Sequence, residues 1–166
     1  LLGLATAVAV ALAPAVLPVL VLVALVLGLT SLAAGTAVRT ALWMSGLGLA
    51  ACVVAFVLNL PWSTTWAWDD LVAPRLAGPP ARGLVDVASM RIGQGRFEVL
   101  ALALYLPVVV ALLVARAWRL TWAARAGGLV VVFLVLAVLQ DRDALPFALP
   151  EAGILLAPVG LGLAIA

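Results

Sequence analysis

The residues best suited to chemistry are two adjacent carboxylates in a short aromatic segment, residues 66–70 (WAWDD). Asp69 and Asp70 offer the oxygen ligands that divalent cations prefer, and either carboxylate could act as a base toward a sugar hydroxyl. The alternative is structural, because an acid near the start of a short interfacial helix is favoured by the helix dipole. These two residues are the candidate catalytic site, and no cofactor is indicated.

Two other polar segments are weaker candidates. Residues 84–92 (LVDVASMRI) have the spacing of a short amphipathic helix that lies on a membrane. Residues 140–151 (QDRDALPFALPE) turn apolar after Asp143, which is typical of a segment that dips into the interface. Glu151 at its end fits either a helix start or the rim of a pocket.

Composition excludes several kinds of site. The 166 residues include no His and one Cys, so a metal site built from His and Cys, an intrachain disulfide and a His-based catalytic triad are all excluded. The nine basic residues form no patch that would suit nucleic acid.

The elements that must position these residues are membrane helices. The chain is 67% hydrophobic and 10% charged, with a mean hydropathy of +1.34, whereas soluble domains are about 25% charged. A water-soluble fold is therefore excluded. The sequence predicts an all-α, multi-pass transmembrane helical bundle.

The apolar runs divide into six spans of one transmembrane region. No charge occurs before Arg39, and 38 residues are too many for one crossing of about 30 Å. Pro14 and Pro18 offer the turn, although a kink in one tilted helix is the alternative. Both chain ends lie in apolar runs, so we expect a piece of a longer protein with truncated first and last helices. An outer loop at 61–97 separates the third span from the fourth, and the predicted helices are 1–13, 16–34, 40–60, 98–116, 120–140 and 151–166.

The arginines indicate an orientation. If the helices alternate in direction, one side of the membrane holds four arginines and no acid: Arg39, Arg116, Arg119 and Arg125. All seven acidic residues then fall on the other side. The positive-inside rule then predicts that the first side is cytoplasmic and that loop 61–97 is extracytoplasmic. The stem of Arg125 is expected to snorkel to the inner boundary.

Part of the chain resembles a known family. The segments 116–125 (RAWRLTWAAR), 145–151 (LPFALPE) and 155–164 (LLAPVGLGLA) resemble the membrane portion of actinobacterial envelope proteins of the family 2 glycosyltransferase type, best over 97–166. In that family a soluble nucleotide-sugar domain precedes the membrane helices. Neither its acidic metal-binding motif nor its catalytic base has a counterpart here, so no catalytic residue carries over.

The resemblance implies the membrane part of a glycosyltransferase that acts on envelope polysaccharide or a lipid-linked sugar. The expected partners are the lipid bilayer and, through domains outside this sequence, a lipid-linked or nucleotide sugar. Two other classes remain, a transporter or channel subunit and a non-catalytic membrane scaffold. No predicted complete helix has a charge near its middle, which disfavours an ion-coupled transporter.

Overall fold

A computed structural model describes residues 2–67, 71, 87–89, 102–142, 144–145, 149–150 and 152–165. These residues contain no strand, which confirms the all-α prediction. The described elements, in chain order, are α1 (Leu2–Leu12), α2 (Val16–Ala33), α3 (Val38–Leu58), the 3₁₀ turns η1 (Trp62–Thr64) and η3 (Leu102–Tyr105), α7 (Leu106–Val114), α8 (Trp118–Asp141) and α9 (Ala152–Ile165).

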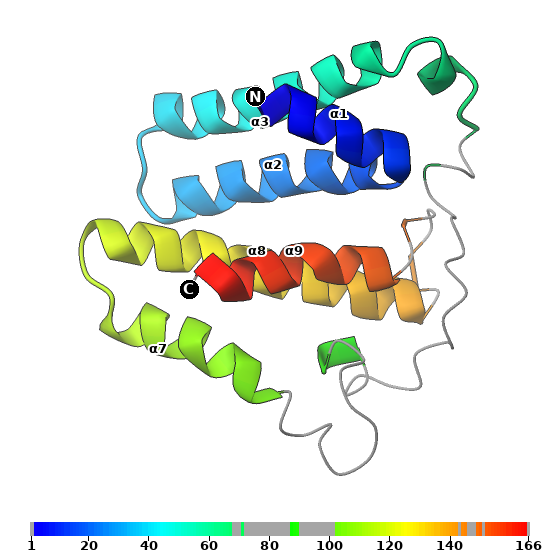
Figure 1. The fold of residues 1–166 in the computed structure, drawn as a ribbon. Helices are drawn as coiled ribbons and strands as arrows, with labels where there is room; N and C mark the ends of the chain where they lie inside the picture. Colours follow the sequence, from blue (N-terminus) through cyan, green and yellow to red (C-terminus); the bar gives the residue numbers. More distant parts are fainter. Residues whose placement is uncertain are drawn as a thin grey trace.

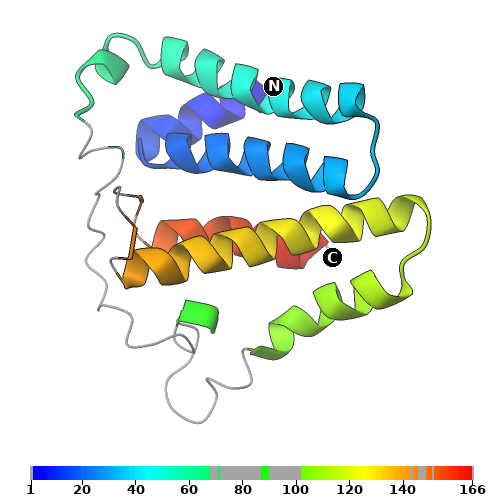
Figure 2. The same ribbon diagram turned by 180° about the vertical axis from the view of Figure 1, so that it is seen from behind.

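The helices form two groups that meet through α2 and α8. Figure 1 shows α1, α2 and α3 above, and α7, α8 and α9 below, with α2 and α8 side by side. Seen from behind, α1 and α9 lie on the same side of their groups (Figure 2). Both views place the α2–α3 turn and the α7–α8 turn at one end of the bundle.

The chain turns back at Pro14 as a hairpin, and not as a kink within one helix. α1 ends at Leu12 and α2 begins at Val16, and the Val16 N–H donates to the Ala13 carbonyl at 3.0 Å. Pro18 then sits in the first turn of α2, where the missing N–H would have no partner within the helix.

A glycine ends α2. Gly35 has φ +76°, its N–H donates to the Leu32 carbonyl, and the N–H of Thr36 donates to the Ser31 carbonyl, both at 3.0 Å. This pair of bonds is the Schellman motif, which needs a left-handed residue at the position that Gly35 holds. The motif turns the chain sharply into α3.

The fourth helix is shorter than the 98–116 that the sequence predicts. Its α-helical part is α7 (Leu106–Val114), preceded by the 3₁₀ turn η3. Pro107 explains the difference, because a proline is tolerated in the first turn of a helix but breaks the hydrogen-bond ladder in its interior. Ala115 is extended, with ψ 140°, and ends the helix at Val114.

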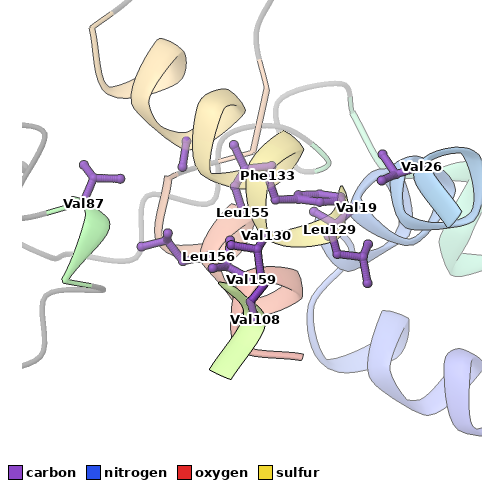
Figure 3. Close-up of a cluster of buried hydrophobic side chains, with 11 residues drawn as sticks. Val19, Val26, Val87, Val108, Leu129, Val130, Phe133, Leu155, Leu156 and Val159 are labelled. Atoms are coloured by element: carbon purple, nitrogen blue, oxygen red, sulfur yellow. The ribbon is translucent and has the colours of Figure 1, made fainter. Parts of the chain in front are cut away.

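Three helices are long and apolar enough to cross a membrane: Val16–Ala33, Val38–Leu58 and Trp118–Gln140. The buried core lies mainly between α8 and α9, with side chains from α2 and α7. Phe133, Leu155 and Val159 are its fully buried centre (Figure 3). Large aliphatic side chains elsewhere are exposed, among them Leu113 at 80%. An apolar exterior of this kind suits hydrocarbon better than water.

Small residues let α2 and α3 approach closely. A side chain added at Gly28 would come within 2.0 Å of Ser45 Oγ, and one added at Gly48 within 2.8 Å of Ala24 Cβ. The Ser45 hydroxyl donates across the interface to the Ala24 carbonyl at 3.1 Å. Small residues and interhelical hydrogen bonds are the usual means by which membrane helices associate.

Candidate functional site

Four arginines gather at the end of the bundle that holds the α2–α3 and α7–α8 turns. Arg39 lies in the first turn of α3, and Arg116 lies in the link before α8 (Figure 1). Arg119 and Arg125 follow on the first two turns of α8. The fold thus brings Arg39 to the same end as three arginines that lie far from it in the sequence, and we call this region the arginine end.

Arg125 is the buried member of this group. Its side chain is 7% exposed, and its Nε–H donates to Ser31 Oγ at 2.8 Å across the α2–α8 interface. Ser31 is fully buried, and its own hydroxyl donates to the Leu27 carbonyl at 2.5 Å. The serine therefore uses its proton within α2 and offers a lone pair to the guanidinium.

An aromatic ring also contacts the Arg125 guanidinium. The guanidinium carbon lies 4.8 Å from the centre of the Trp122 ring, one turn earlier on α8. A cation over a tryptophan face is stabilised by about 0.5–2 kcal/mol, more where water is excluded. Arg125 is the seventh residue after Trp118, which places it about 10 Å further along the helix. Because α8 is long and apolar enough to span a membrane, and charges inside spanning helices are rare and expensive, Arg125 is a candidate functional residue.

The position of Arg125 differs from the snorkelling arginine that the sequence predicts. Its guanidinium bonds Ser31 between two helices instead of extending to the boundary. The reason is the close approach of α2 and α8, where a side chain added at Gly128 would come within 2.1 Å of Thr30 Cγ2. The pairing of residues 31 and 125 could not be read from spacing, because it depends on which helices are neighbours.

Three cavities adjoin this region. One of about 300 Å³ lies between α7, α8 and α9 and is lined by Trp118, Arg119 and Trp122, together with small and aliphatic residues. A second, of about 560 Å³, lies deeper between α7 and α8 and is almost wholly apolar. A third, of about 710 Å³, opens at the start of α3 beside Arg39 and Trp43.

The candidate carboxylates Asp69 and Asp70 lie outside the described residues, as do Asp143 and Glu151. Their neighbour Trp66 is described, and its ring packs edge-on against Phe56 with centroids 6.1 Å apart. Among the residues that the structure does describe, no group of three metal-ligating side chains occurs. The structure therefore leaves the predicted site at Asp69 and Asp70 as a prediction.

The segment 84–92 is described only at residues 87–89. The sequence predicts a helix that lies on the membrane, but these three residues are buried in the bundle. Val87 joins the main core, and the Tyr105 hydroxyl donates to the Ala88 carbonyl at 2.6 Å. Over these residues the membrane-surface interpretation is wrong, because the packing partner is protein.

Comparison of the chain with family models, with curated proteins and with solved structures finds no match in any of the three. The site is therefore defined by its own geometry, which is a set of cations and tryptophans around cavities at one end of an apolar helical bundle.

Proposed function

We propose that this chain is the integral membrane region of a bacterial cell-envelope protein, and that it anchors a glycosyltransferase acting on envelope polysaccharide or a lipid-linked sugar. The observation that carries the membrane part is the set of three helices long and apolar enough to span a bilayer. The transferase part is supported by the family resemblance of residues 97–166.

We place the arginine end on the cytoplasmic side of the cell membrane. Support comes from the common position of Arg39, Arg116 and Arg119 at one end of the bundle (Figure 2), since positively charged residues near short loops are retained in the cytoplasm. Trp43, Trp118 and Trp122 accompany them and are exposed, which suits a ring at headgroup depth.

Alkaline extraction of membranes tests the first part of the proposal. The full-length protein should stay in the pellet with the lipid, because helices that span a bilayer are held by their apolar surface. Release into the supernatant, under conditions that retain a known multi-pass protein, would contradict membrane integration.

The transferase part is tested by deleting the gene and measuring sugar incorporated into envelope polysaccharide and lipid-linked intermediates. Loss of a defined sugar, restored by the full-length gene, supports the proposal. Restoration should fail with the Asp69→Asn, Asp70→Asn double variant at an unchanged membrane level if those carboxylates serve the site. An unaltered envelope in the deletion strain would favour a transporter or a scaffold instead.

A further inference from the structure

The two cavities beside α7 and α8 have complementary character. The cavity nearer the start of α8 has a cation and two indole rings on its wall, Arg119, Trp118 and Trp122. The deeper cavity is lined by aliphatic side chains and glycines, apart from Tyr105, whose hydroxyl is already engaged by the Ala88 carbonyl. One offers a place for a charged head and the other a place for hydrocarbon.

The cavities follow one another along α8 and are adjacent on α7. On α8, Ala123 lines the first cavity and Gly127, one turn deeper, lines the second. On α7, Ala111 lines the first cavity, whereas Val108 and Leu112, on either side of it in the sequence, line the second. The second cavity extends from Ala124 to Val135 on α8, about 16 Å along the axis, which is close to half of a hydrocarbon core about 30 Å thick.

We propose that these cavities form one binding site for an anionic membrane phospholipid, with the phosphate at Arg119 and an acyl chain in the apolar groove between α7 and α8. The proposal rests on the membrane location and does not depend on sugar transfer.

Charge decides the class of lipid. Arg119 is exposed at the cavity with its guanidinium carbon 5.8 Å from the centre of the Trp118 ring, and Arg39, Arg116 and Arg125 lie at the same end. A guanidinium pairs with phosphate through two parallel hydrogen bonds, and basic pockets between membrane helices are recognised sites for anionic headgroups. Cavities of about 300 and 560 Å³ are within the range of ligand pockets, about 300–1,000 Å³.

The test measures lipid bound to the full-length protein in mild detergent by native mass spectrometry. Phosphatidylglycerol and phosphatidylcholine with the same acyl chains are titrated separately. Wild type should bind phosphatidylglycerol more tightly. Arg119→Gln should weaken the binding of phosphatidylglycerol about tenfold, as expected for loss of a charge-assisted contact. The binding of phosphatidylcholine should be nearly unchanged.

Two matched control variants distinguish a specific lipid site from nonspecific binding of lipid to the protein surface. Arg116→Gln removes the same charge from the same end at a residue outside the lining of these cavities, so it should have little effect. Ala124→Leu fills the apolar groove and should weaken the binding of both lipids. Gly46→Leu adds the same side chain where no atom lies within 4 Å, so it should change the binding of neither lipid.

Three results would overturn the assignment. Equal losses of phosphatidylglycerol affinity in Arg116→Gln and Arg119→Gln would indicate that the lipid is attracted by the overall positive charge of this end and not by one site. Preference for a polyisoprenyl phosphate over phosphatidylglycerol would replace the phospholipid with an isoprenoid. Absence of retained lipid in wild type, with the protein folded, would mean that something else covers the groove.

Discussion

Two residues at the arginine end have positive φ, and only one of them is a glycine. Ala117 has φ 52° and ψ −128°, and the Arg119 N–H donates to the Arg116 carbonyl at 3.2 Å. These angles match the second position of a type II′ turn, which glycine favours. Ala117→Gly should therefore stabilise the protein by about 1 kcal/mol.

The reciprocal change at Gly35 should have the opposite sign. Gly35→Ala meets no atom within 4 Å, so its effect reports backbone strain alone, about 1–2 kcal/mol of destabilisation. Thermal unfolding in detergent measures both variants against wild type. If the two variants shift the unfolding temperature in the same direction, the positive φ angles at Ala117 and Gly35 are wrong.

The hydrogen bond between Arg125 and Ser31 gives a second residue-scale prediction. Ser31→Ala leaves the Arg125 Nε–H without its partner in a buried interface, which should destabilise the protein by about 1–3 kcal/mol. Thr121→Ala is the control, because that hydroxyl bonds only the Trp118 carbonyl in its own helix. Similar unfolding temperatures for the two variants would argue against a structural role for the Arg125–Ser31 contact.

At the scale of elements, the small residues between α2 and α3 predict how the helices tolerate a methyl group. Gly28→Ala would overlap Ser45 Oγ, and overpacking of this kind costs about 1–3 kcal/mol. Gly46→Ala is the matched control on α3, where the added carbon meets nothing within 4 Å. It should stabilise the helix by up to about 1 kcal/mol. Chemical denaturation of both variants checks the prediction, and a stabilising Gly28→Ala would contradict the interface.

The sequence predicts the helices well where one physical rule dominates. Apolar runs of spanning length locate α2, α3 and α8, and Pro14 locates the first turn, since proline and polar residues are the strongest interruptions of an apolar helix. The sequence prediction misses the start of α7 because Pro107 lies inside an unbroken apolar run, where the hydropathy does not change at the helix boundary. The burial of Val87 and of Arg125 is missed because each depends on a partner distant in sequence.

At the scale of the whole molecule, the distribution of charge along the bundle and the direction of the long helices indicate the same membrane normal. The described arginines other than Arg142 lie at the end with the α2–α3 and α7–α8 turns, and Pro14, η1 and Arg142 lie at the other (Figure 1). A bilayer perpendicular to this axis leaves the three long apolar helices across its core. Arg39, Arg116 and Arg119 are then at one surface, where the headgroups and water can solvate them.

This axis predicts the pattern of chemical labelling in intact cells. In a Cys52→Ala background, which removes the native buried thiol, a cysteine in place of Thr65 should react with a membrane-impermeant thiol reagent. A cysteine in place of Ala117 should react only after the cells are opened. Thr65 and Ala117 are both exposed, but they lie at opposite ends of the bundle (Figure 2). A cysteine at position 78, in the predicted outer loop, should behave like the one at 65. The reverse pattern would place the arginine end outside, and labelling at both ends in intact cells would contradict a spanning bundle.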